Sequence, residues 1–529
     1  MGKRHDLTRR TALAAIAAAA ASPALAQPPR IKGPGIYDPD APAPTPAPGS
    51  KTGTPGVYIN ELDAFPNSAV QVDTACTGFV GYTQKRPRKT GAMQVSSFAE
   101  YTAYFGGHDT PKVRLINGEP VFTRAPALLS RSVAAFFTNG GDKCMIASAG
   151  GYGAAPALQS MLNALSRLEP EKSIALLAAP DAMRLSRDDS AAFQRAMLVQ
   201  AGREQDRFAV LDVWGADGKT MNPEEAGDAF RRGIGQDGLA FGAAYLPFGF
   251  FPEGTRVTFA DFADRKQLSE LLLAEFNKAP FGRNPDALRA ALRNPAEMDD
   301  ASLADTSPAA EAERISLHSD LIKISPLYST LIAHASRKLS LLPPSGAMAG
   351  LFARTDNEQG VWKAPANRSV VGLVEPSTAI SEREQDFYVR QEPALNPIRT
   401  FANLGPLVWG ARTLAVNDLE RTYINIQRTR IMIEQSIKYG IAAYVFQPND
   451  ANTWMTVKSM VDNFLNSLWK QGALVGGTPD QAFAVQIGLG STMTAQDVSN
   501  GVMIVSAQVA LARPAEFVAF EFRQKMTAS

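Results

Sequence analysis

Histidine is scarce in this chain, and its spacing predicts neither a metal site nor a catalytic pair. The sequence has four histidines: His5, His108, His318 and His334. No two of them stand at a metal-ligand spacing such as HExxH, no GxxxxGK[ST] phosphate loop occurs, and no GxGxxG stands between a strand and a helix. The adjacent carboxylates Asp299 and Asp300 lie in a polar stretch and are interpreted as solvated surface. We therefore expect no metal and no cofactor.

One stretch, 490–495 (GSTMTA), resembles the serine loop of subtilisin-like proteases. Nucleophilic catalysis by Ser491 would also require a base and an orienting acid within reach. No histidine stands in a protease-type sequence context. The sequence therefore predicts no catalytic residues and a protein that is not an enzyme.

The composition describes an ordinary globular chain without a strong charge. The chain has 529 residues and a formal net charge of +1, whereas binding to nucleic acid needs a concentrated cationic surface, so nucleic acid is not expected as a partner. The two cysteines, Cys76 and Cys144, allow one disulfide at most, and each stands in an apolar, strand-like context. We expect both to be buried thiols.

Residues 1–26 are typical of an export signal of the twin-arginine kind. Arg9 and Arg10 precede an apolar run over 12–21, and 24–26 (ALA) offers a small-x-small cleavage site. An Ala-rich helix at the start of the chain is the alternative. No stretch reaches the ~20 apolar residues of a permanent membrane helix, so we expect no stable membrane insertion. Residues 27–53, rich in Pro, Gly and Ala, are interpreted as an extended linker.

From residue 54 onward, strands and helices alternate. Strands are expected over 57–62, 78–83, 143–147, 173–178 and 207–213, and helices over 132–139 and 190–202. Continuous apolar strands separated by helices indicate an α/β domain with a largely parallel sheet covered on both faces. The polar, proline-broken stretch 279–320 is interpreted as an inserted loop or small subdomain of this domain, which we place at 54–390.

The remaining part, 391–529, has a different, α+β character. Two helices are expected, over 418–439, ending at Gly440, and over 452–471. In the first helix isoleucines form an apolar stripe, and the charged residues Arg421, Arg428, Arg430 and Glu434 lie off it. Two strands, 502–507 and 516–522, are expected to close the chain as a hairpin or meander.

Several short motifs follow one another along the chain. They are 54–59 (TPGVYI), 136–141 (FFTNGG), 342–350 (LPPSGAMAG), 353–356 (ARTD), 360–367 (GVWKAPAN), 396–399 (NPIR), 408–414 (VWGARTL), 444–450 (YVFQPND), 472–474 (GAL) and 514–517 (PAEF). In this order, over residues 54–525, the chain resembles the phage contractile tail sheath family.

The resemblance implies a multidomain tail-sheath fold, with a subtilisin-like α/β portion that lacks protease function and a C-terminal domain that faces an inner tube. It also implies a homo-oligomer of stacked hexameric rings wound helically around that tube, with baseplate and terminator proteins as further partners. The family stores energy in an extended lattice and releases it on contraction, which drives the tube through an envelope.

A lattice that moves without dissociating needs tethers that survive rotation. Backbone hydrogen bonds to a neighbour's sheet edge persist while a flexible stem swings, and such a head-to-tail contact is open-ended, as a helical filament requires. Two strands are the expected donors: Val57, Tyr58, Ile59, Asn60, Glu61 and Leu62, and Glu516, Phe517, Val518, Ala519, Phe520, Glu521 and Phe522. Pairing of both strands within their own subunit is the alternative.

Contact with the tube is expected from polar positions on the 452–471 helix: Lys458, Asp462 and Lys470. A solvated helix face is the alternative at these positions. The resemblance implies assembly in the bacterial cytoplasm, as a phage tail or related contractile particle, whereas the signal-like residues 1–26 indicate twin-arginine export to the periplasm. Two other functions therefore remain: an exported, envelope-associated scaffold derived from a sheath, and an exported hydrolase that reuses the α/β portion.

Overall fold

The computed structural model describes residues 68–86, 91–254, 256–278, 285–297, 303, 305, 307–415 and 417–515. All of these residues belong to one compact unit, Asp63–Ser529. Within the described residues, no helix is both long and apolar enough to cross a membrane.

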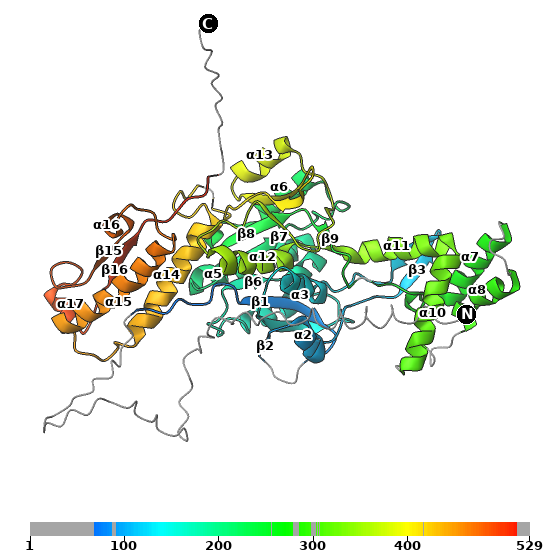
Figure 1. Ribbon diagram of the computed structural model, residues 1–529, viewed down its shortest axis with the longest axis horizontal. Helices are drawn as coiled ribbons and strands as arrows, with labels where there is room; N and C mark the ends of the chain where they lie inside the picture. The colour runs from blue at the N-terminus through cyan, green and yellow to red at the C-terminus, as the bar shows by residue number, and fades with distance from the viewer. Residues whose placement is uncertain are drawn as a thin grey trace, which may run out of the picture. The chain divides into compact units, whose positions relative to one another are not determined.

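A nine-stranded, mostly parallel sheet forms the centre of this unit (Figure 1). In spatial order its strands are β11 (Arg368–Ser369), β14 (Gly405–Val408), β13 (Leu395–Phe401), β8 (Gly242–Leu246), β7 (Phe208–Asp212), β6 (Leu176–Ala178), β1 (Thr77–Thr83), β5 (Cys144–Gly151) and β2 (Met93–Val95). The run from β13 to β5 is parallel, and the strands at both edges are antiparallel.

Helices cover both faces of the sheet. Alternate side chains of a strand point to opposite faces, so the apolar residues of one strand are divided between two buried clusters. Val80 of β1 belongs to one buried cluster with α4 (Leu158–Ser166), α5 (Arg187–Glu204) and α6 (Pro223–Ile234). Its neighbour Phe79 belongs to the opposite cluster, with α3 (Leu129–Thr138) and α12 (Ser345–Gln359), beside which lies α2 (Phe98–Phe105). The predicted parallel sheet with two covered faces is confirmed.

The predicted strands and helices of this domain agree with the structure within a few residues. The expected strands 78–83, 143–147, 173–178 and 207–213 correspond to β1, β5, β6 and β7, and the expected helices correspond to α3 and α5. Cys76 and Cys144 are buried free thiols, as expected. The predicted boundary at residue 391 falls before β13 and β14, which pair into the central sheet, so the C-terminal part of the fold begins after them.

The described residues of the polar stretch 279–320 belong to a helical subdomain with a core of its own. Its elements are α7 (Arg265–Lys278), α8 (Pro285–Glu297), α10 (Pro308–Ile324), α11 (Pro326–Ser340) and the hairpin β3 (Val113–Ile116) and β4 (Glu119–Phe122). Leu272, Leu321 and Leu331 are buried together in that core. The sequence pattern missed these helices because their apolar residues are diluted by polar ones and prolines.

Smaller elements complete the central part. They are the three-stranded sheet β10 (Leu341–Leu342), β9 (Gly249–Phe250) and β12 (Glu375–Pro376), the helix α13 (Glu382–Arg390), and the 3-10 turns η1 (Pro180–Arg184), η2 (Leu239–Phe241) and η3 (Phe259–Asp261).

The C-terminal lobe consists of two long helices and a two-stranded antiparallel sheet. Its elements are α14 (Ile424–Ala442), α15 (Ala451–Lys470), α16 (Pro479–Ala482), α17 (Ala495–Ser499), β15 (Phe483–Gln486) and β16 (Ser506–Val509). Met432 of α14 and Phe464 of α15 are buried in its core with Val485 of β15. The stripe predicted for the second helix is therefore core.

Gly440 does not end α14, as the sequence predicts, because the helix continues to Ala442. A side chain at Gly440 would lie 3.1 Å from both Ala69 and Met460, so the glycine allows close packing rather than a stop. The expected strand 502–507 is also shifted, to Ser506–Val509, and its partner is β15. Val502 still belongs to the turn after α17, where its N–H donates to the carbonyl of Asp497 at 2.8 Å.

Candidate functional site

The side chains that could do chemistry have local structural partners. His108 Nδ1 lies 3.2 Å from Ser130 Oγ, and burial lowers the pKa of His108 to about 4. His318 Nδ1 lies 2.8 Å from the hydroxyl of Tyr328 inside the helical subdomain. The hydroxyl of Ser491 donates at 3.1 Å to a backbone carbonyl three residues earlier. These contacts bring no histidine to Ser491, and no group of three His, Cys, Asp or Glu side chains in the described ranges could hold a metal ion.

One buried carboxylate with a raised pKa, Asp212, is a helix anchor that the sequence reasoning did not find. It ends β7, and its two oxygens accept hydrogen bonds from the N–H (2.8 Å) and hydroxyl (2.6 Å) of Ser345, the first residue of α12. Burial raises the pKa of Asp212 to about 7, and the bonds from Ser345 oppose that rise. With both oxygens engaged by Ser345, this carboxylate positions α12.

The C-terminal lobe has a groove of about 740 Å³ between α14 and the segment that contains β16. Ile426, Ile433 and Ile437 contribute its apolar wall from α14, and Val505 and Val509 contribute from the other side. Arg430 and Glu434, an ion pair at 2.7 Å, stand on the same helix face and border it. We call this the α14–β16 groove.

The groove lies beside a strand that has a partner on one side only in the described part of the chain. β16 pairs with β15, and these two strands are the whole of their sheet among the described residues. A strand edge next to an apolar wall is the surface to which an extended segment can add, with backbone hydrogen bonds for affinity and side-chain pockets for register. The arrangement can therefore bind an extended peptide.

The two candidate donor strands, 57–62 and 516–522, lie outside the described residues, as does the predicted pairing of the second with 502–507. The candidate tube-facing residues are described. Lys458 and Asp462, one turn apart on α15, form an ion pair with each other at 2.6 Å and are partly exposed. Lys470 is the last residue of the same helix.

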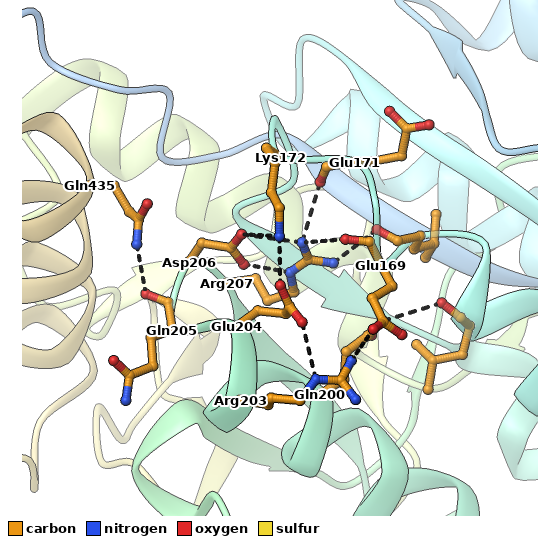
Figure 2. A network of polar contacts seen from close by, with 12 residues as sticks. Glu169, Glu171, Lys172, Gln200, Arg203, Glu204, Gln205, Asp206, Arg207 and Gln435 are labelled. Atoms are coloured by element: carbon orange, nitrogen blue, oxygen red, sulfur yellow. Dashed lines mark hydrogen bonds and ion pairs between the residues drawn. The ribbon is translucent and has the colours of Figure 1, made fainter. Parts of the chain in front are cut away.

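The opposite side of α14 is tied to the central domain by polar contacts. Arg428, which the sequence reasoning placed merely off the apolar stripe, is buried and donates to both oxygens of Asp356 in α12, at 3.0 and 2.5 Å. Gln435 donates to the carbonyl of Gln205 at 3.2 Å (Figure 2). No sequence motif signals these ties, because each joins residues far apart in the chain.

The segment that contains Gln205 is held in place by a network of polar contacts (Figure 2). The next two residues, Asp206 and Arg207, form a buried ion pair at 2.6 Å, and the guanidinium of Arg207 also donates to three backbone carbonyls in the segment after α4. Lys172 extends the network to Glu204 at 2.5 Å. The end of α5 is thus held on several sides.

The fold and these surfaces define a multidomain α/β protein with an apolar groove beside the edge of a two-stranded sheet. Residues 418–525 match the family model described as the phage tail sheath C-terminal domain. The chain is 27% identical over 164 residues to a tail sheath protein of Burkholderia phage BcepMu, covering 30% of this chain and 34% of the relative. It is 28% identical over 171 residues to a putative prophage major tail sheath protein of Pseudomonas aeruginosa strain UCBPP-PA14, covering 30% of this chain and 41% of the relative.

Solved structures extend the likeness to most of the chain. The sheath complex of an extracellular contractile injection system (PVC, contracted state) has a TM-score of 0.57 and 25% identity, over 90% of this chain and 99% of that one. A chain in the baseplate of the anti-feeding prophage has a TM-score of 0.55 and 25% identity, over 90% of this chain and all (100%) of that one. The resemblance to the contractile tail sheath family is therefore confirmed, in sequence near the C-terminus and in the multidomain fold. The chain matches only about a third of the length of the BcepMu relative.

Proposed function

We propose that this chain is a structural protomer of a contractile sheath, which polymerises as stacked hexameric rings around an inner tube and contracts to drive it through a cell envelope. The observation that carries the proposal is the structural likeness to an injection-system sheath, which extends over 90% of this chain and 99% of the sheath chain. The phage tail sheath match at residues 418–525 agrees with it.

Copies are joined by strand exchange. A donor strand of one copy, Val57–Leu62 or Glu516–Phe522, adds to the β16 edge of the next and covers the apolar wall of the α14–β16 groove. Alternate side chains of a strand point to opposite faces. One face of a donor strand can therefore meet the isoleucines of α14 while its backbone groups pair with β16. Because donor and acceptor are different surfaces of the same chain, the contact is head-to-tail, and it can propagate from copy to copy into a helical assembly.

The other partners are the inner tube, a baseplate and terminator proteins. The likeness to a baseplate chain of the anti-feeding prophage supports association with a baseplate. Lys458, Asp462 and Lys470 on α15 are the proposed tube contacts. Lys458 and Asp462 form an ion pair within α15, and both side chains are partly exposed. A surface ion pair contributes little free energy, so either residue can exchange its partner for one on the tube, as a contact that must release requires.

This protomer acts by assembly and not by catalysis, and the particle is a phage tail or related contractile device. The domain division into 1–26, 27–53, 54–390 and 391–529 belongs to the same proposal, with the shift of the last boundary past β14. Export through residues 1–26 would adapt the protomer to work beyond the inner membrane, as a scaffold derived from a sheath.

Electron microscopy of purified chains tests the proposal. A chain that begins at Gln27 is expected to form hollow tubes at high concentration, and a chain that begins at Asp63 is expected not to. A chain that begins at Thr54 is the matched control, because it keeps the donor strand and should form tubes. If the chain that begins at Asp63 also formed tubes, the N-terminal strand would not be needed for assembly.

A further inference from the structure

Helix α14 makes two sets of contacts, on different sides. Ile426, Arg430 and Ile437 line the α14–β16 groove, whereas Arg428 and Gln435 contact the central domain. At 3.6 residues per turn, these two sets of positions lie on nearly opposite sides of the helix. The same rigid element therefore borders the proposed acceptor groove and reaches the rest of the molecule.

The inner side of α14 also holds the segment 68–76, which we call the N-terminal root because it leads from the proposed donor strand into β1. The N–H of Val72 donates to Ser436 Oγ at 3.0 Å, and Arg428 Nη2 donates to the carbonyl of Thr74 at 2.8 Å. Ala69 is buried against Gly440, as the close approach at that glycine requires. Three contacts in succession thus fasten the root along α14.

The ties at Thr74 and Asp73 continue into the central domain. The hydroxyl of Thr74 donates to Asp356 at 2.6 Å, so Arg428, Thr74 and Asp356 form one cluster in which the two charged side chains are only 4% and 5% exposed. Asp73 pairs with Lys143 at 2.5 Å. Removing one partner of a buried ion pair leaves an uncompensated charge, so this cluster resists separation of the root from α14 and α12.

We propose that α14 carries tension between neighbouring copies: a second copy's donor strand pulls on its groove side, and the chain's own N-terminal root is fastened to its inner side through Arg428 and Ser436. The inference rests on the proposed strand exchange. The contacts that hold the N-terminal root on α14 bear load in the sheath, and they are separate from the contacts through which copies assemble.

The first test uses the folded chain from Gln27 as a monomer, and its readout is hydrogen exchange. Ser436→Ala removes the acceptor for the Val72 amide and is expected to speed exchange in peptides over 68–76 by about tenfold, with β1 and β5 unchanged. Arg428→Lys, which keeps the charge but loses the two-pronged bond to Asp356, is expected to do the same. Arg430→Lys, on the groove side, is the matched control and should leave 68–76 unchanged. Unchanged exchange in both inner-side variants would overturn the proposal.

The second test measures force. The chain is pulled in optical tweezers between a handle at Asn60→Cys and one at Glu434→Cys, so that the load crosses the root and α14. The first yielding event is expected at lower force in Ser436→Ala and in Arg428→Lys than in the parent, and Arg203→Lys, an exposed member of the network in Figure 2, should match the parent. Equal yield forces in all variants would overturn the proposal.

Electron microscopy of the same variants separates this inference from the proposed function. Ser436→Ala is expected to form tubes like the parent, because it leaves groove and donor strand intact. Failure of the parent chain to form tubes contradicts the sheath proposal and, with it, the tension between copies. Normal tubes whose subunits show no weakening at the root contradict the inference alone.

Discussion

Asp212 lies at the carboxyl end of β7 and holds the first residue of α12 through two hydrogen bonds from Ser345. Burial raises the pKa of Asp212 to about 7 from its ordinary 3.8, so the folded chain keeps a proton there that the unfolded chain releases. Between pH about 4 and about 7 the folded state binds more protons, and this group's contribution to the free energy of unfolding falls as pH rises, by up to ~1.4 kcal/mol per pH unit.

Asp212→Asn should abolish this pH dependence while an amide oxygen still accepts from Ser345. We expect the variant to gain stability relative to the parent as pH increases from 5 to 7.5, measured as the difference in urea-unfolding free energy. Above pH about 7 the difference should level off. A difference that does not change with pH would show that Asp212 is ionised in the folded chain throughout.

Asp181 is a second buried carboxylate that serves a helix start. It accepts hydrogen bonds from the N–H of Tyr82 in β1 and of Leu128 at the start of α3, both at 2.7 Å, and α3 has no side-chain cap of its own. Gly81 makes room for it, since a side chain there would lie 2.6 Å from Asp181.

Asp181→Ala is therefore expected to destabilise the central domain by about 3 kcal/mol, because it leaves buried N–H donors without an acceptor. Asp181→Asn keeps one acceptor oxygen and should cost less. Thermal unfolding of the two variants beside the parent checks the order, and equal stability of Asp181→Ala and the parent would contradict the anchoring role.

At the scale of elements, the packing of α14 on α15 depends on Gly440. A side chain there meets Ala69 and Met460 at 3.1 Å, so Gly440→Leu must displace one of them and is expected to destabilise the C-terminal lobe by about 1–3 kcal/mol. Gly440→Ala is the control, because its gain of up to about 1 kcal/mol in helix propensity offsets a smaller clash. Urea unfolding followed by tryptophan fluorescence measures both. A Gly440→Leu variant as stable as the parent would mean that α14 and α15 separate easily.

The elements that the sequence predicted are those whose pattern is local. β1 is a continuous apolar run, and α15 has a clear helical stripe with an Asp450 cap, so both are visible without a partner. Gly440 was misinterpreted because a glycine that permits close packing has the same sequence signature as one that ends a helix. Arg428 and Asp356 could not be paired from the sequence, since 72 positions separate them.

At the scale of the whole molecule, the ordered motifs predicted the sheath fold, and the acceptor surface emerged only from the structure. The α14–β16 groove joins residues of α14 to residues more than sixty positions later, around a strand that the sequence had placed too early. The donor strands were predicted from the strand-like patterns at 57–62 and 516–522, and the first of them follows the Pro/Gly-rich stretch that the sequence predicts to be an extended linker.

The most direct test of the central claim is cysteine cross-linking between differently tagged copies in assembled tubes. One copy carries Ile59→Cys or Val518→Cys, the other carries Ala507→Cys in the groove, and Leu419→Cys, which is 72% exposed and not a lining residue of the groove, is the control acceptor. The strand-exchange account predicts a covalent dimer of two copies with Ala507→Cys for at least one donor, and none above background with Leu419→Cys. Tubes in which neither donor links to Ala507→Cys more than to the control would contradict it.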